Sequence, residues 1–256
     1  MRRSALASAL GCLAAAAALY AAFFAPALRH FSGAIPYTAY AGERAPLVLE
    51  QGDHLQLLYH FDLLDAYLGG DLPFFRNLWE FNTADEDRPA RFDTCYAPFA
   101  MPYSLLRRCG ATDAAAWNSC QFLSVFLGVL FCYALARRFG AGRTAALCLS
   151  AVSSCVPYRW VVLAGGSPTG FGMGLVPAVA LGIDAAVRDR SLRGGFLAAA
   201  ALVCCYAADL HCYLFAALSV PFWCAVAFLR ARTGGKRFGA RVAPSSRIPK
   251  SSPCLI

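Results

Sequence analysis

The sequence predicts an all-α protein, a polytopic bundle of about six transmembrane helices with a large helical outer loop between the first crossing and the second. Of the 256 residues, 59% are hydrophobic and only 15% are charged, whereas roughly 25% of a soluble domain is charged. The mean hydropathy is +0.50. The hydrophobic residues are also gathered into runs, several of which approach the ~20 residues that a spanning helix needs.

The order of these runs defines four segments. Residues 1–28 hold an apolar run behind Arg2 and Arg3, which is typical of a signal anchor with its N-terminus inside. Residues 29–113 form a polar outer loop, and residues 114–230 form the transmembrane bundle. Residues 231–256 are basic and rich in Ser and Pro, so we expect an unstructured cytoplasmic tail.

The last apolar stretch, residues 196–229, is too long for one crossing. A helix of 34 residues would measure about 51 Å, against a hydrocarbon core of ~30 Å. Asp209 and His211 lie near its middle. We therefore expect two short helices joined by a tight turn there, and a re-entrant pair is the alternative.

The charge distribution supports this topology and excludes a nucleic-acid-binding protein. The chain has a net charge of +8, but residues 29–112 hold 7 Arg against 11 Asp and Glu, a net −4. The basic residues flank the apolar runs instead. With six crossings, the arginine-rich connectors and both ends of the chain fall inside, as the positive-inside rule requires. We expect an integral multi-pass protein of a bacterial inner membrane.

Twelve cysteines give no metal or redox motif. Nine of them lie inside apolar runs, where Cys acts as a small hydrophobic residue. No C-x-x-C pair occurs, so no zinc spacing is present. Cys95 and Cys109 are the two cysteines of the outer loop. They either form a disulfide or remain free thiols.

The outer loop contains an amphipathic helix that starts near Asp53. A face formed by Leu57, Phe61, Leu64 and Leu68 is apolar, and Asp53, Gln56 and His60 form an adjoining polar stripe. Asp53 followed by Gln56 resembles a capping box, so this aspartate is either a helix cap or a catalytic carboxylate. His54 is either a catalytic partner or an interfacial residue.

Polar residues inside the apolar runs are candidates for function. Arg159, Asp209 and His211 all lie toward the outer side in the predicted topology, the same side as Asp53 and His54. We therefore expect an outer-face site, with a structural Arg159–Asp209 ion pair as the alternative. Asp184 and Arg188, four residues apart near the inner side, are expected to form a simple helix pair.

Small residues four apart in residues 170–186 predict close helix packing rather than chemistry. They are Gly170, Gly174, Ala178, Gly182 and Ala186.

The outer loop also carries a resemblance to a known family. Gly52-Asp53-His54-Leu55-Gln56, Asn77-Leu78-Trp79-Glu80-Phe81-Asn82 and Tyr96-Ala97-Pro98-Phe99 are similar to the first outer loop of large bacterial members of the C superfamily of membrane glycosyltransferases. The arrangement of one crossing, a long loop and many further crossings resembles the same superfamily. The resemblance covers residues 1–230 by architecture and only short motifs by sequence. Members usually have an acidic pair where this chain has Asp53-His54, and more crossings, so the chain would be an N-terminal fragment.

The resemblance implies sugar transfer from a polyprenyl-phosphate donor at the outer membrane face. Asp53 would be the base that deprotonates the acceptor hydroxyl, with His54 beside it. The resemblance carries a role onto Asp53 only. From its own chemistry, Arg159 is expected to hold the donor phosphate, since a guanidinium fits phosphate oxygens, and Asp209 and His211 are expected to contact substrate. A divalent cation is left open as a cofactor. A transporter and a non-catalytic membrane subunit or remnant are the alternative functions, and membrane lipids are the expected surroundings.

Overall fold

The computed structural model describes residues 2–35, 39–40, 48–49, 53–73 and 96–241. Within these ranges the chain is helical apart from turns and a two-residue antiparallel ladder, β1 (Ala39–Tyr40) with β2 (Val48–Leu49). The prediction of an all-α architecture is confirmed at this level.

Four helices or continuous helical segments are long and apolar enough to cross a membrane. They lie in α1 (Arg2–Arg29), α4 (Asp113–Arg138), the pair α7 (Pro168–Gly172) and α8 (Val176–Arg188), and α10 (Leu210–Arg241).

Two shorter pieces make a fifth candidate span. They are α5 (Arg143–Ser154) and α6 (Pro157–Ala164), which meet at a bend of 57°. Pro157 begins α6, and the residue before a proline is pushed out of the helical conformation. The apolar helix α9 (Leu192–Ala208) has 17 residues. A sixth crossing through α9 stays a prediction.

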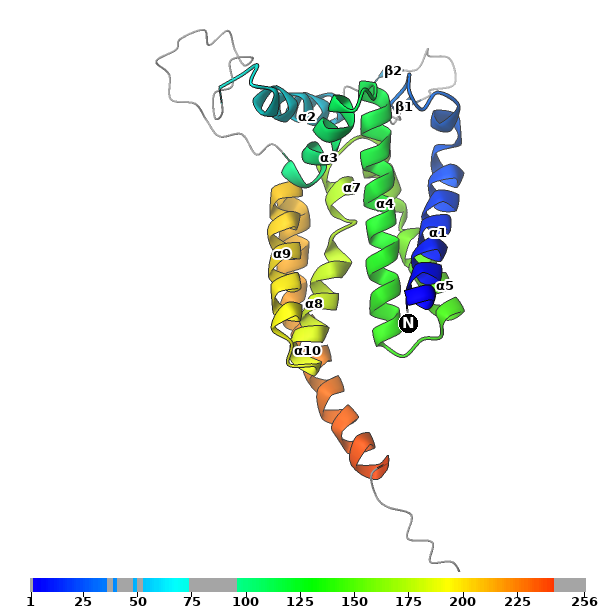
Figure 1. Ribbon diagram of the computed structural model, residues 1–256, viewed down its shortest axis with the longest axis vertical. Helices are drawn as coiled ribbons and strands as arrows, with labels where there is room; N and C mark the ends of the chain where they lie inside the picture. The colour runs from blue at the N-terminus through cyan, green and yellow to red at the C-terminus, as the bar shows by residue number, and fades with distance from the viewer. Residues whose placement is uncertain (1, 36–38, 41–47, 50–52, 74–95, 242–256) are drawn as a thin grey trace, which may run out of the picture.

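The bundle has two unlike ends (Figure 1). At one end, the α2 end, the helices α2 (Asp53–Gly69) and α3 (Ala97–Arg108) cap the bundle, and α2 lies across the spanning helices. The beginning of α1 and the lower part of α10 lie at the other end, which we call the N-terminal end. Helix α10 continues to Arg241, whereas the unstructured tail was expected from residue 231.

The long stretch 196–229 is two helices, as predicted. Helix α9 ends at Ala208, and α10 begins at Leu210. The Asp209 carboxylate accepts a hydrogen bond from the Cys212 backbone N–H at 2.9 Å, and so caps α10. Figure 1 shows α9 and α10 side by side, with the break toward the α2 end.

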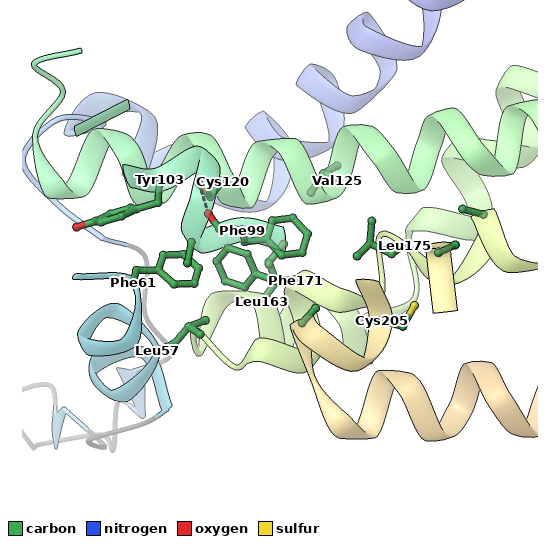
Figure 2. Packing of buried hydrophobic residues seen from close by; sticks show 14 of the residues in the cluster. Leu57, Phe61, Phe99, Tyr103, Cys120, Val125, Leu163, Phe171, Leu175 and Cys205 are labelled. Atoms are coloured by element: carbon green, nitrogen blue, oxygen red, sulfur yellow. Dashed lines mark hydrogen bonds between the residues drawn. The ribbon is translucent and has the colours of Figure 1, made fainter. Parts of the chain in front are cut away.

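An aromatic cluster holds α2 on the bundle (Figure 2). Phe171 of α7 lies at its centre, with ring centroids 5.9 Å from Phe61, 5.4 Å from Phe99 and 5.2 Å from Trp117. These four side chains are buried and come from four different helices. Burying each of them removes a large apolar surface from polar surroundings.

The amphipathic face predicted for α2 is only part of what is buried. Leu57, Phe61 and Leu64 are buried as expected, but Leu68 is exposed. The helix is buried on more than one side, since Leu63, Ala66 and Tyr67 are buried as well.

Helix α4 carries buried polar side chains that donate hydrogen bonds to backbone carbonyls where neighbouring helices end. Asn118 donates to the carbonyls of Phe31 and Ala34 just beyond α1. Gln121 donates to the Leu163 carbonyl at the end of α6, at 2.8 Å, and Ser124 donates to the Phe171 carbonyl in α7, at 2.7 Å. Carbonyls freed by a helix end need such partners where water is excluded. These side chains thus allow α6 and α7 to end inside the bundle.

The small residues predicted for packing do pack. A Cβ on Gly170 would stand 2.5 Å from the Leu163 backbone nitrogen of α6, and one on Gly182 would collide with the Ala198 backbone of α9. A Cβ on Gly174 would lie at least as close to the Ser124 backbone oxygen of α4. The glycines therefore set the distance between α7–α8 and three neighbouring helices.

Candidate functional site

A pocket of about 190 Å³ opens at the α2 end. Four parts of the chain meet there: α2, the residue before α3, the turn between α6 and α7, and the break between α9 and α10. Its walls are Gln56, Leu57, Tyr96, Ser167, Pro168, Thr169, Asp209 and His211. Two of the predicted site residues, Asp209 and His211, are therefore brought together with Gln56 of the polar stripe of α2.

The Asp209 carboxylate is held by its surroundings. Its Oδ2 accepts hydrogen bonds from Thr169 Oγ1 at 2.9 Å and from the Cys212 backbone N–H at 2.9 Å. Its Oδ1 lies 3.4 Å from His211 Nδ1. The residue is buried, so these contacts supply the partners that water would otherwise give.

The His211 side chain is 75% exposed. Since Nδ1 lies beside the Asp209 carboxylate, an N–H on Nδ1 leaves Nε2 as the proton acceptor of the neutral ring. An orienting carboxylate and an exposed imidazole form a pair that can accept a proton or a hydrogen bond from a ligand.

Tyr96 contributes a strained wall. Its φ of 46° and ψ of 43° place it in the left-handed region just before α3, a conformation that costs a bulky residue roughly 1–2 kcal/mol. Its ring lies 5.1 Å from the ring of His60, centroid to centroid. Strained backbone of this kind persists where neighbouring contacts hold it in place.

Asp53 and His54 stand at the first positions of α2, and their side chains lie outside the part of the chain that the structure describes. Gln56 lines the pocket three residues after Asp53. Gln56 belongs to the first turn of α2, so the start of this helix is next to the pocket. The choice between cap and catalytic carboxylate for Asp53 stays open.

Arg159 lies elsewhere. It is buried in α6, where its Nη2 donates to the Ser124 carbonyl at 2.7 Å and approaches Ser124 Oγ at 3.3 Å. A Cβ on Gly128 would stand 2.6 Å from Nη1, so the glycine makes room for the guanidinium. Arg159 forms no ion pair with Asp209, and it is not part of the pocket wall.

The structure describes one of the two cysteines of the predicted pair. Cys109, directly after α3, is exposed, and Cys95 lies outside the described residues. The disulfide therefore stays a prediction. Within the described ranges, no three His, Cys, Asp or Glu side chains gather as a metal site would require.

A polar clamp joins α2 to α3 and α4, and no pattern in the sequence indicates it. Tyr103 Oη lies 2.6 Å from Asp62 Oδ1 and 3.2 Å from Asp113 Oδ1, and Arg107 Nε pairs with Asp113 at 2.6 Å. Burial raises the pKa of Asp62, and the Tyr103 hydroxyl opposes that shift. Burial and the contact with Asp62 raise the pKa of Tyr103.

A second set of contacts extends the clamp. Asp65 accepts from the Ser104 hydroxyl and pairs with Arg108 Nε at 3.2 Å. The two sets fix α2 in the position that lets Gln56 reach the pocket.

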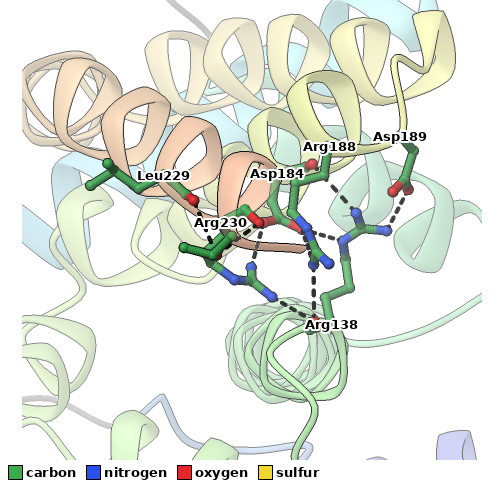
Figure 3. A network of polar contacts seen from close by, with 7 residues as sticks. Arg138, Asp184, Arg188, Asp189, Leu229 and Arg230 are labelled. Carbon is green, nitrogen blue, oxygen red and sulfur yellow. Dashed lines mark hydrogen bonds and ion pairs between the residues drawn. The ribbon is translucent and has the colours of Figure 1, made fainter. Parts of the chain in front are cut away.

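A second ionic network lies at the N-terminal end (Figure 3). The buried Asp184 carboxylate pairs with Arg138 Nε of α4 at 2.6 Å and with Arg230 of α10. The expected pair with Arg188 is the longest of its contacts, at 3.7 Å. Asp184 is thus not a simple helix pair. It joins α4, α8 and α10, because a carboxylate so deeply buried needs cations from more than one side.

Comparison with family models, curated proteins and solved structures finds no match to this chain.

Proposed function

We propose that this protein is a membrane-embedded glycosyltransferase that moves a sugar from a polyprenyl-phosphate donor to an acceptor at the outer face of a bacterial inner membrane. The observation that supports the proposal is the pocket at the α2 end. It joins the start of α2, which carries Asp53, to the Asp209–His211 pair. A pocket at the end of a bundle lies where a lipid-linked donor and a water-soluble acceptor can meet.

The proposed topology has six crossings, with α9 and α10 as the fifth and sixth. The connectors at the N-terminal end hold Arg137, Arg138, Arg143, Arg188, Arg190 and Arg193. An excess of arginine marks the cytoplasmic side, so the α2 end would face outward. Helix α9 would span about 25 Å, short of the ~30 Å core, which it can meet by local thinning of the bilayer.

In the proposed reaction, Asp53 takes the proton of the acceptor hydroxyl. The acceptor oxygen then attacks the anomeric carbon, the carbon–oxygen bond to phosphate breaks, and polyprenyl phosphate leaves with the electron pair. Asp209 and His211 hold the sugar or the acceptor, through Nε2 and the carboxylate that orients it. Donation by Arg159 to the donor phosphate would require its guanidinium to leave Ser124, so we assign the donor phosphate no residue of α6.

The transporter alternative has one observation in its favour. The span made by α5 and α6 is bent by 57°, and a buried arginine follows the bend. Interrupted helices with charged residues line the paths of many transporters. The α4 side chains that bind the freed carbonyls account for the interruption without a transported substrate.

The decisive experiment supplies the purified chain in lipid vesicles with a membrane extract that contains radiolabelled lipid-linked sugars. Transfer of label to an acceptor, lost in Asp53→Asn and in His211→Ala, supports the proposal. Asn retains a capping oxygen, so Asp53→Asn removes the base without removing the cap. Uptake of free labelled sugar into the vesicles without transfer would instead favour the transporter.

A further inference from the structure

Among the side chains that the structure describes, five exposed arginines lie at the N-terminal end of the bundle, and we call them the basic rim. They come from the ends of α4, α5 and α9, from the turn between α8 and α9, and from α10: Arg137, Arg143, Arg193, Arg190 and Arg232. The network around Asp184 lies at the same end of the bundle and adds three arginines with partly buried side chains, Arg138, Arg188 and Arg230.

The charge of this rim is not balanced within the described part of the protein. Asp184 and Asp189 are the acidic residues that the structure describes at this end, and both are engaged by Arg138. Arg143, Arg190, Arg193 and Arg232 form no ion pair with any described residue. Arg137 donates to a backbone carbonyl, that of Ala141, at 2.6 Å.

Exposed apolar side chains beside the basic rim indicate that this part of the protein is surrounded by lipid. Leu192 and Phe196 are 92% and 77% exposed, next to Arg193, and Phe228 and Leu229 are exposed beside Arg232. The Arg232 guanidinium lies 4.4 Å above the centroid of the Phe228 ring. Large exposed side chains on apolar helices, in a bundle with several candidate spans, face acyl chains. The adjacent guanidinium groups are then at the depth of the lipid headgroups.

The opposite end of the bundle differs. Arg107 and Arg108 are paired there with Asp113 and Asp65, and Arg29 is an exposed arginine at the end of α1. Asp62 and Asp71 add negative charge. The unpaired cations are therefore concentrated at one end.

We propose that the basic rim binds the phosphate groups of anionic phospholipids in the leaflet at the N-terminal end. Guanidinium groups form forked, charge-assisted hydrogen bonds to phosphate oxygens. A basic residue close to an anionic leaflet strengthens binding about fivefold. Because leucine and phenylalanine side chains that face acyl chains lie beside the rim, the expected partner is a phospholipid rather than a soluble phosphate. The proposal does not depend on the proposed sugar transfer.

The test compares the full chain in mixed micelles that contain phosphatidylglycerol or phosphatidylcholine. Bound lipid is counted by native mass spectrometry, and the midpoint of thermal unfolding is measured in both. We expect preferential retention of phosphatidylglycerol and a higher midpoint with it, both weakened by salt. Inorganic phosphate at the same concentration should give no such rise in midpoint.

Three variants locate the effect. Replacing Arg143, Arg190, Arg193 and Arg232 together by Gln should weaken phosphatidylglycerol binding at least a hundredfold, while the same four positions as Lys should retain most of it. Arg29→Gln is the matched control at the α2 end and should bind like the original chain. Unfolding midpoints in phosphatidylcholine alone show that each variant is folded.

The proposal is overturned if the chain shows no preference for phosphatidylglycerol, or if the Gln variant retains it. A loss in Arg29→Gln of about a quarter of the binding free energy that the four-residue Gln variant loses would also overturn it, since the effect would then follow total charge rather than the rim. Equal stabilisation by inorganic phosphate would show a soluble-anion site instead.

Discussion

Thr169 and Asp209 are 40 residues apart in the chain, and a hydrogen bond of 2.9 Å joins them. The bond ties the first turn of α7 to the break between α9 and α10. It also holds two walls of the pocket together, since both residues line it. The carboxylate that caps α10 is thus the same group that fixes the α6–α7 turn.

Removing this carboxylate should destabilise the fold. Asp209→Ala leaves the Cys212 N–H and the Thr169 hydroxyl without their buried acceptor, which should cost about 1–3 kcal/mol. Thr169→Val should cost about 1 kcal/mol, and less in the Asp209→Ala background. Unfolding in detergent measures both. Thr233→Val, at an exposed position of α10, is the control and should change little; purely additive costs would contradict the coupling.

Gly128→Ala tests the position of Arg159. The new Cβ would stand 2.6 Å from Nη1, so the guanidinium must shift, which weakens its hydrogen bond to the Ser124 carbonyl. We expect a loss of about 1–3 kcal/mol of stability. Gly195→Ala in α9 meets nothing within 4 Å and should be neutral or slightly stabilising, because Ala favours helix. Combining Gly128→Ala with the shorter Arg159→Gln should recover part of the loss, and no recovery would place the strain elsewhere.

The helices were predictable from hydrophobic runs, because a spanning segment must be apolar along its whole length. The break at Asp209 was predictable too. A carboxylate is unfavourable inside the hydrocarbon core, so an apolar run too long for one crossing is expected to turn back at that residue. The bend between α5 and α6 was not, although Pro157 signals it locally, because residues 144–164 have the length of one crossing.

Contacts between distant residues were not predictable from one sequence. Asp184 was assigned to Arg188 because i, i+4 neighbours are the partners that helix geometry makes visible. Its shorter contacts to Arg138 and Arg230 exist only once three helices assemble. For the same reason the sequence placed Arg159 near Asp209, whereas helix packing directs its guanidinium to Ser124.

Asp184→Ala should be among the most damaging single substitutions. It leaves the guanidinium groups of Arg138, Arg188 and Arg230 without their shared carboxylate, and an uncompensated buried ion pair costs about 3–5 kcal/mol. Asp189→Ala removes a half-exposed partner of Arg138 and should cost about 1 kcal/mol or less. Unfolding curves of the two variants give the comparison. Equal losses would mean that Asp184 does not join the three helices.

The clamp between α2 and α3 should respond to pH through Asp62. Burial raises the pKa of this carboxyl in the folded protein, so the folded state favours its protonated form. Its ionisation therefore costs stability at neutral pH, and that cost disappears as pH falls through the folded pKa. Relative to Asp62→Asn, the original chain should gain stability on acidification.

Unfolding measured from neutral pH down to about pH 4 tests this difference. Tyr103→Phe removes the hydroxyl that lowers the pKa of Asp62, so the gain should then begin at a higher pH. The carboxylates of Asp65 and Asp113 and the guanidinium of Arg107 face the same group and stay in place in both variants. A constant difference between the original chain and Asp62→Asn over this range would contradict the assignment.

The topology can be tested at the α9–α10 break, where three arrangements give different results. If 192–233 crosses twice, His211 is outside and both Arg190 and Arg232 are inside. A single crossing would place Arg232 outside, and a re-entrant pair would keep His211 out of reach of an impermeant reagent.

The side chain of His211 is 75% exposed, so a cysteine there is open to labelling. The exposed cysteines Cys109, Cys148, Cys155 and Cys224 are first replaced by alanine, together with Cys95 and Cys254, which lie outside the described residues. We then expect His211→Cys to react with an impermeant maleimide in intact cells. Arg190→Cys and Arg232→Cys should react only after permeabilisation. If Arg232→Cys is labelled in intact cells, the two helices form one crossing. If His211→Cys is protected until the membrane is dissolved, the two helices are re-entrant and the pocket does not lie at the outer face.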